Sequence, residues 1–287
     1  MAFVTEDNIT EIAVQRWATS HSPRMAELMT AAIKHLHAFA KEVDLTGEEW
    51  MGALEFLTAT GQASDEKRKE FILLSDVLGL SMLVVMRNAR QPKGATPTTV
   101  LGPFHIEDSP ELGHGESMTF GAEGEPCFVT GQVRDLRGRP IAGARLDVWQ
   151  ADTAGDYEAQ IPGQEGPRLR AIYTTGADGR YCVRTVNPRG YAIPMDGPVG
   201  ALIGKTEISY FRPAHIHFLL SAPGQADLIS CIFRSGAEYL DSDVVFGCKQ
   251  DLITDFTRHA SGLAPTGEAM AQPFWTVEFD FVLSPQA

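Results

Sequence analysis

Residues 212–220 of the 287-residue chain read RPAHIHFLL, and the run after Pro213 belongs to the sheet that decides the fold. Its apolar and aromatic residues predict a β-strand over 215–220. Alternate residues of a strand project from the same face, so His215 and His217 share one face while Ile216 points to the other. We therefore expect a sheet that carries two imidazoles on one face.

Further short runs with the same strand character lie on both sides of this stretch. Turn-forming pairs such as Asp178-Gly179 and Asn187-Pro188 separate several of them. The pattern predicts an antiparallel β-sandwich. Its strands are expected at residues 128–133, 145–149, 170–174, 181–186, 215–220, 228–233 and 275–283.

The first ninety residues have a different character, with Pro23 as the only proline before Pro92. Thr46-Gly-Glu-Glu49 fits a capping box, in which the threonine and glutamate side chains satisfy the first amides of a helix. Residues 67–88 predict one long helix that is apolar on nearly all sides, so we expect it to be buried between partners. The fold class is thus mainly β with an α-helical N-terminal part.

A segment rich in proline and glycine separates the two parts and predicts an irregular connector. We expect a helical N-terminal domain over 1–92, a connector over 93–126 and a β-sandwich catalytic domain over 127–287.

Composition and charge narrow the classes of function. Lysine and arginine number 24 against 37 acidic residues, which gives a net charge of −13 and argues against a nucleic-acid partner. The start, MAFVTEDNITE, lacks the features of a signal peptide, so we expect neither secretion nor membrane insertion. The four cysteines contain no C-x-x-C pair and are expected to be reduced thiols.

The spacing of His215 and His217 permits two interpretations. Both imidazoles can reach one metal ion, or both can be hydrogen-bonded residues of a half-buried strand. The pair selects no particular metal, because imidazole suits Zn, Cu, Ni and Fe.

Three segments together resemble the intradiol ring-cleaving dioxygenases. Residues 212–218 (RPAHIHF) resemble the metal-binding strand of that family. Residues 143–157 (GARLDVWQADTAGDY) resemble its first tyrosine segment, and residues 187–194 (NPRGYAIP) resemble its second. The match keeps the family's order over nearly the whole chain.

The resemblance implies a site that holds one non-haem Fe(III) per subunit. Its ligands would be Tyr157, Tyr191, His215 and His217. A tyrosinate is a hard anionic donor that stabilises the ferric ion. In the implied reaction Tyr191 leaves the metal and takes up a substrate proton, and Arg212 stabilises negative charge on the ring. The substrate would be a catechol-type diol, cleaved by O₂ between its two hydroxylated carbons.

Three further segments, 70–79, 100–105 and 239–247, resemble hydroxyquinol dioxygenases more than catechol enzymes. The implied product is 3-hydroxy-cis,cis-muconate (maleylacetate). Asp76 stands in an apolar stretch, where its carboxylate needs a hydrogen-bond donor. The donor would be either a third hydroxyl group of the substrate or a backbone amide or arginine of the protein. Cys231 stands where relatives commonly place glutamine or histidine. The implied substrate-binding residues are Leu73, Asp76, Val100, Leu101, Gly102, Pro103, Phe104, Ile193, Pro194, Arg212, Cys231 and Val245.

Two alternatives remain open at this point. One is a dioxygenase for catechol or a substituted catechol. The other is a non-catalytic, transthyretin-like binding module, which residues 131–144 also resemble. The family resemblance further implies a cytoplasmic homodimer formed through the N-terminal helices around a bound phospholipid.

Overall fold

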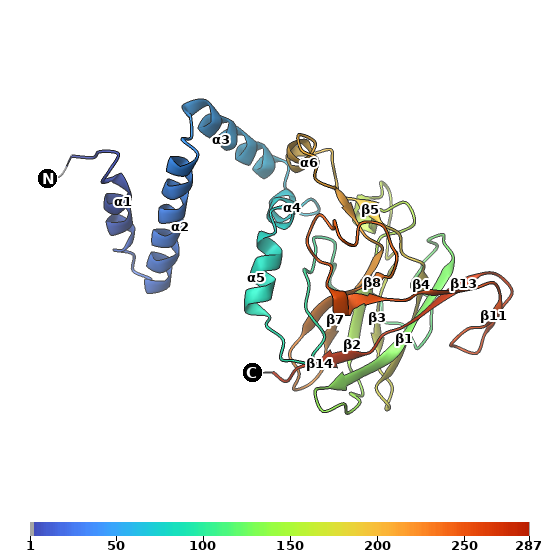
Figure 1. Cartoon of the computed structure of the whole chain (residues 1–287). Helices are drawn as coiled ribbons and strands as arrows, with labels where there is room; N and C mark the ends of the chain where they lie inside the picture. Colours follow the sequence, from blue (N-terminus) through green and yellow to red (C-terminus); the bar gives the residue numbers. More distant parts are fainter. Residues whose placement is uncertain (1–2, 287) are drawn as a thin grey trace. The chain divides into compact units, whose positions relative to one another are not determined.

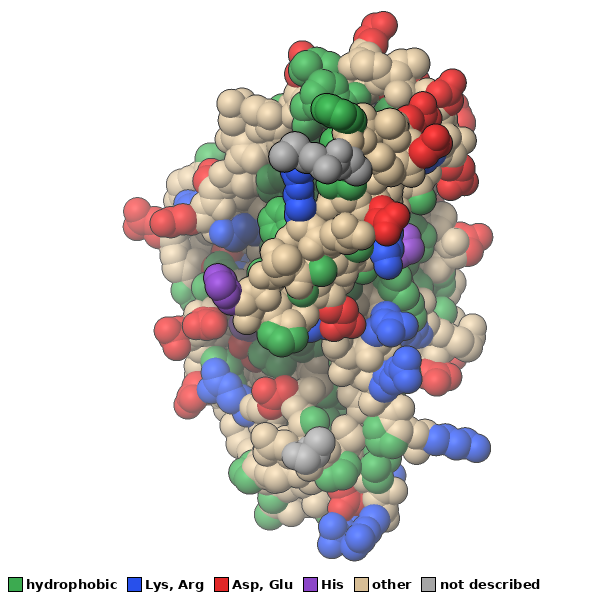
Figure 2. Space-filling view, turned by 90° about the vertical axis from the view of Figure 1, so that its left-hand side faces the viewer, with side chains coloured by type: hydrophobic (Ala, Val, Ile, Leu, Met, Phe, Trp, Pro, Cys, Tyr) green, Lys and Arg blue, Asp and Glu red, His purple; other side chains and the backbone are tan. Residues whose placement is uncertain are grey.

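The computed structural model describes residues 3–286, which form two compact units. The first unit ends at Ala59 and the second begins at Thr60. None of the helices among the described residues is long and apolar enough to cross a membrane. On the face drawn in Figure 2, acidic and basic side chains are interspersed.

Two helices of the first unit begin with clear capping signals. Ser22 accepts a hydrogen bond from the amide of Met25 at 3.3 Å, ahead of a proline at the first helical position. The capping box is confirmed, because Thr46 N donates to Glu49 Oε2 at 2.9 Å and Glu49 N donates to Thr46 Oγ1 at 3.2 Å. The helices are α1 (Ile9–Trp17), α2 (Pro23–Glu42) and α3 (Gly47–Gln62), the last of which runs across the boundary.

The prediction of a single helix over residues 67–88 is wrong. The chain forms α4 (Glu70–Val77) and α5 (Leu80–Asn88), with Gly79 between them. Gly79 has φ of +71°, a left-handed conformation that ends one helix and lets the chain turn into the next. The apolar pattern continues across the break, which is why it does not reveal it.

Two five-stranded sheets form the sandwich of the second unit (Figure 1). In the first sheet the strand order is β3 (Arg170–Thr174), β2 (Arg145–Trp149), β7 (His215–Ser221), β8 (Leu228–Arg234) and β9 (Ile253–Thr254). In the second the order is β10 (Thr257–His259), β13 (Phe274–Glu278), β1 (Pro126–Asp135) and β14 (Phe281–Leu283), and β4 (Arg180–Val186) also pairs with β1.

The sandwich is mixed, which corrects the expectation of a purely antiparallel one. Strands β13 and β14 both run parallel to β1, and β9 runs parallel to β8. The expected single strand over 275–283 is interrupted at Phe279 and Asp280. Side-chain alternation identifies a strand but carries no information on its direction, and the long connection between β8 and β9 lets the chain return in either sense.

The hydrophobic core lies between the two sheets and faces one side of β7. Ile216, Phe218 and Leu220 of β7 are fully buried in it. The intervening His215 and His217 therefore project from the opposite face, as the strand period requires. Short elements surround that face or extend from the sandwich, namely β5 (Tyr191–Ala192), β6 (Phe211–Arg212), β11 (Gly262–Leu263), β12 (Ala269–Met270), α6 (Pro198–Ile203) and the 3₁₀ turns Glu158–Gln160 and Gln250–Leu252.

Candidate metal centre and substrate cavity

The two histidines of β7 present their Nε2 atoms to each other at 3.1 Å. Nδ1 of His215 lies 2.7 Å from the carbonyl oxygen of Pro213 and so carries the proton, because a carbonyl can only accept. Nε2 of His215 is therefore an unprotonated donor to a metal. Burial and the charge of Arg212 lower the pKa of His215 to about 3. The pKa of His217 is also well below its usual value, mainly through burial.

Two tyrosines from separate segments bring their phenols to the same place. The oxygens of Tyr157 and Tyr191 lie 3.2 Å apart, and both residues are buried. Tyr157 follows a turn held by Asp152, and its amide donates to Gln160 Oε1 at 2.9 Å. Strand β5 carries Tyr191 and pairs with β6, so Tyr191 lies opposite Arg212. The tertiary structure thus gathers all four expected ligands.

The donor set fits a trivalent metal ion. Among the described residues, histidine, cysteine, aspartate and glutamate form no cluster of three or more that could hold a metal, so a site here needs the phenols. Burial raises the pKa of both Tyr157 and Tyr191, which makes their phenolates costly without a nearby cation. Two phenolates and two neutral imidazoles supply hard anionic oxygen and nitrogen, the donors that suit Fe(III).

Aromatic rings and a thiol surround these side chains. The ring of Phe104 stacks on Tyr157 with centroids 4.4 Å apart. Trp149 stacks on His217 with centroids 4.9 Å apart. Cys231 Sγ lies 3.1 Å from His217 Nδ1, and burial raises the pKa of this thiol to about 12. The thiol therefore remains protonated near neutral pH.

A cavity of about 400 Å³ adjoins the four side chains. Tyr191 and His217 line it directly. All the expected substrate-binding residues except Cys231 also line the cavity. Cys231 lies behind His217, with its thiol against His217 Nδ1. The connector contributes its residues 100–104 to the wall and is anchored just before them, where Thr99 N donates to Ile229 O at 2.9 Å. Further lining residues include Lys67, Arg68, Lys69, Glu70, Trp149, Asp156, Ala159, Gln160 and Asp196.

Asp76 is a buried carboxyl group in the wall of this cavity. Burial raises its pKa, while a hydrogen bond with Ser81 and the charge of Arg212 act in the opposite direction. The cavity is therefore not purely apolar at this point, and it offers a polar group to a substrate substituent.

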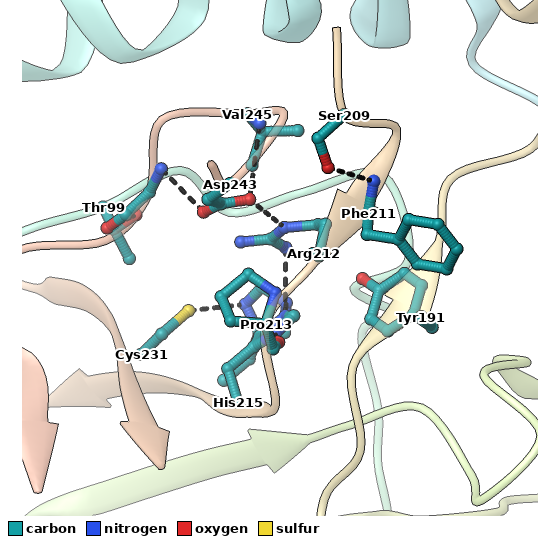
Figure 3. Close-up of polar contacts among 12 residues, drawn as sticks. Thr99, Tyr191, Ser209, Phe211, Arg212, Pro213, His215, Cys231, Asp243 and Val245 are labelled. Carbon is teal, nitrogen blue, oxygen red and sulfur yellow. Dashed lines mark hydrogen bonds and ion pairs between the residues drawn. The ribbon is translucent and has the colours of Figure 1, made fainter. Parts of the chain in front are cut away.

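Arg212 is a buried cation that lies between His215 and the carboxylate of Asp243 (Figure 3). Its Nη1 lies 3.0 Å from His215 Nε2, and its Nε donates to Asp243 Oδ1 at 3.2 Å. Nη2 is buried and has no hydrogen-bond partner among residues 3–286. A guanidinium at this position can stabilise negative charge that develops on a bound molecule.

Sequence reasoning did not single out several residues of this site. Trp149 lies inside the first tyrosine segment, but its stacking on His217 depends on the pairing of two strands. Asp243 lies inside the segment 239–247, where nothing local indicates a partner 31 positions away. Buried carboxylates need partners, so the position of Asp243 directly before the apolar run Val244–Phe246 was the one available signal.

A cluster of possible metal ligands beside a small-molecule cavity at the edge of a sandwich is the arrangement of an enzyme's active site. The family described as "Dioxygenase" matches residues 100–285, and the family described as "Catechol dioxygenase N terminus" matches residues 22–96. The chain therefore belongs to the intradiol ring-cleavage dioxygenases.

Three similar proteins illustrate the relationship. A 6-chlorohydroxyquinol 1,2-dioxygenase from Cupriavidus pinatubonensis is 46% identical, and the match covers 98% of each chain. The solved structure of hydroxyquinol 1,2-dioxygenase from Pseudomonas putida DLL-E4 has a TM-score of 0.91 and 43% identity, covering 98% of this chain and 99% of that one. Catechol 1,2-dioxygenase from Pseudomonas arvilla C-1 has a TM-score of 0.85 and 27% identity, covering 97% and 92%.

Proposed function

We propose that this dioxygenase cleaves the ring of hydroxyquinol (1,2,4-trihydroxybenzene) between its two adjacent hydroxylated carbons and inserts both atoms of O₂. The product is 3-hydroxy-cis,cis-muconate, which is a tautomer of maleylacetate. The observation that carries the proposal is the convergence of two phenols and two imidazoles beside a cavity that also contains Arg212 and Asp76. The names of the relatives at 46% and 43% identity support this substrate class.

Tyr157, Tyr191, His215 and His217 would hold one Fe(III) per subunit. Bound there, the ion would act as a Lewis acid to which the two diol oxygens could bind, and it would make the ring reactive toward O₂. Tyr191 lines the cavity, so its phenol is the one that the substrate meets and its oxygen is the acceptor of a substrate proton. Phe104 stacks on Tyr157 and Trp149 stacks on His217, so these two rings exclude water from the side chains that they cover.

Arg212 and Asp76 bind and orient the substrate. Arg212 provides a fixed positive charge for the electron-rich ring. Because the guanidinium is already buried and paired with Asp243, it needs little rearrangement when the substrate binds. Asp76 accepts a hydrogen bond from the third hydroxyl of hydroxyquinol, which catechol lacks. A cavity of about 400 Å³ lies within the usual range for small-molecule sites.

The proposal extends to assembly and location. Leu36 is 65% exposed, Phe39 53% and Trp50 52%, and apolar side chains this exposed on neighbouring helices fit a covering partner. We assign the domain over 1–92 to homodimerisation around a phospholipid. The connector over 93–126 and the sandwich over 127–287 then form the catalytic part of a cytoplasmic enzyme, and Leu73 and Asp76 of the N-terminal part complete its cavity.

The visible absorption of the purified protein tests the proposal. The iron-loaded protein is expected to show a broad tyrosinate-to-Fe(III) band that shifts when hydroxyquinol is added without oxygen. On admission of O₂, hydroxyquinol should be consumed with a higher kcat/KM than catechol. Preference for catechol would favour a catechol 1,2-dioxygenase, and a protein that stays colourless with iron would contradict the metal site and favour the binding module.

A further inference from the structure

The guanidinium of Arg212 is held by a carboxylate from a distant part of the chain. Arg212 Nε and Asp243 Oδ1 lie 3.2 Å apart, and their side chains are 5% and 2% exposed. Burial acts to raise the pKa of Asp243, but the charge and the hydrogen bond of Arg212, together with smaller contributions from His215 and the Val245 amide, outweigh it, so this pKa lies below its usual value. The pair is thus a buried ion pair in which both partners are charged at neutral pH.

The backbone that follows Asp243 fixes its carboxylate in turn. Oδ2 accepts a hydrogen bond from Gly247 N at 2.9 Å, and Oδ1 accepts one from Val245 N at 3.4 Å (Figure 3). The carboxylate therefore has donors on both oxygens and cannot rotate without losing one of them. Val245 belongs to the cavity wall, so this short turn lies directly at the substrate site.

Gly247 closes the remaining side of the guanidinium. A β-carbon at this position would lie 3.1 Å from Arg212 Nη2, 3.1 Å from Asp243 Oδ2 and 3.2 Å from Thr99 Oγ1. These separations are tighter than ordinary contacts, so a side chain at this position would push the guanidinium or the carboxylate aside by a few tenths of an ångström. The position of Arg212 is determined by a carboxylate on one edge and by a glycine on another.

We propose that Asp243 is a positioning residue for the ring-cleavage reaction, which holds the guanidinium of Arg212 at the place where it stabilises negative charge on the bound ring. The role rests on the proposed function. Asp243 does not itself line the cavity, and none of its hydrogen bonds goes to the four expected metal ligands, so it acts through Arg212.

The first test is Asp243→Asn. An asparagine has one acceptor oxygen in place of two. Either Arg212 or Gly247 N therefore faces the NH₂ group of the asparagine, which cannot accept a hydrogen bond. We expect kcat per bound iron to fall about 10- to 100-fold, the usual effect of losing a residue that orients a functional group. KM for hydroxyquinol, the iron content and the visible band should change little.

Asp280→Asn provides a control in a more exposed arginine–carboxylate pair, whose side chains are 40% and 38% exposed. Asp280 also pairs with an arginine, Arg134 at 3.0 Å, and also accepts a backbone amide, Gln132 N at 2.8 Å, but it does not line the cavity. This variant should retain the kcat of the parent protein. An equal loss in both variants would show a general effect on folding and would overturn the positioning role.

A double-mutant cycle separates positioning from a purely structural effect. If Asp243 acts through Arg212, then Arg212→Met combined with Asp243→Asn should lose no more kcat/KM than Arg212→Met alone. The double variant also leaves no unpaired buried charge, so it should be more stable than Arg212→Met. Losses that multiply independently would contradict the proposal.

Gly247→Ala covers the case in which Asp243→Asn does not fold. It keeps both charges and adds one methyl group against the guanidinium, so kcat per iron should fall while the visible band remains. Parent-like kcat in this variant or in Asp243→Asn would overturn the proposal. A parent protein that cleaves no diol would instead contradict the proposed function, which keeps the two failures distinguishable.

Discussion

The indole of Trp149 lies flat against the imidazole of His217, with ring centroids 4.9 Å apart and planes 3° apart. The two residues are direct neighbours across β2 and β7, and His217 is likewise the direct neighbour of Cys231 across β7 and β8. Three adjacent strands therefore place an indole, an imidazole and a thiol side by side. The orientation of one expected metal ligand follows from strand register.

Replacing Trp149 should damage both stability and metal binding. Trp149→Ala removes a fully buried indole and should lower the free energy of unfolding by about 3–5 kcal/mol. The His217 ring then loses its stacking partner, so iron affinity should fall as well. Urea unfolding and iron titration measure the two effects, with Trp149→Phe as a milder control. Unchanged iron affinity in Trp149→Ala would contradict the orienting role.

The two phenols should differ from other tyrosines in their effect on colour. Tyr157→Phe and Tyr191→Phe each remove one oxygen donor, so each should weaken or shift the visible band and lower iron affinity. Tyr173 is the control, since it is equally buried but donates to Glu116 O at 2.8 Å. Tyr173→Phe should keep the band and cost about 1 kcal/mol of stability. A parent-like band in both Tyr157→Phe and Tyr191→Phe would refute the ligand assignment.

Asp76 should determine the choice between hydroxyquinol and catechol. Asp76→Asn keeps the shape of the side chain but weakens its acceptor, so the preference for the triol should fall by about 1.5–3 kcal/mol, roughly 10- to 100-fold. The loss should appear in kcat/KM for hydroxyquinol, with catechol turnover much less affected. Equal changes for both substrates would show that Asp76 does not recognise the third hydroxyl.

Glu125 should contribute to stability in a pH-dependent way. Hydrogen bonds from Arg258 and Trp275 lower the pKa of Glu125 from 4.5 to about 2. A lowered pKa stabilises the folded state above pH 4.5, and this contribution disappears as the pH falls toward 2. Glu125→Gln should therefore be less stable than the parent at neutral pH, with the difference shrinking in acid. Urea unfolding at several pH values checks this, and a constant difference would contradict it.

Two glycines should respond to alanine in opposite directions. Gly79→Ala forces a β-carbon into a left-handed conformation, 3.3 Å from the ring of Phe246, and should cost about 1–2 kcal/mol or more. Gly52 lies within α3 with no atom within 4 Å of an added β-carbon, so Gly52→Ala should stabilise by about 0.5–1 kcal/mol. Thermal or urea unfolding measures both. A stabilised Gly79→Ala would refute the strain at the α4–α5 break.

Local patterns predicted most strands of the sandwich closely, because alternation and turn residues act over a few positions. The strand expected at 145–149 coincides with β2, and that expected at 170–174 coincides with β3. Strand direction and the break at Gly79 escaped prediction, since the first depends on distant connections and the second on one backbone angle. The motifs that resemble the family identified the four expected metal ligands, and the fold brings their side chains together.

The sequence by itself determined the residue types that this chemistry needs and the strand period that puts His215 and His217 on one face. Only the tertiary structure decided which distant groups meet them. The pairing of Asp243 with Arg212, the stacking of Trp149 and the place of Cys231 behind His217 all join segments that are far apart in the chain. The reason is physical: the periodicity of a strand is local, whereas register, burial and ion pairing arise when separate segments pack together.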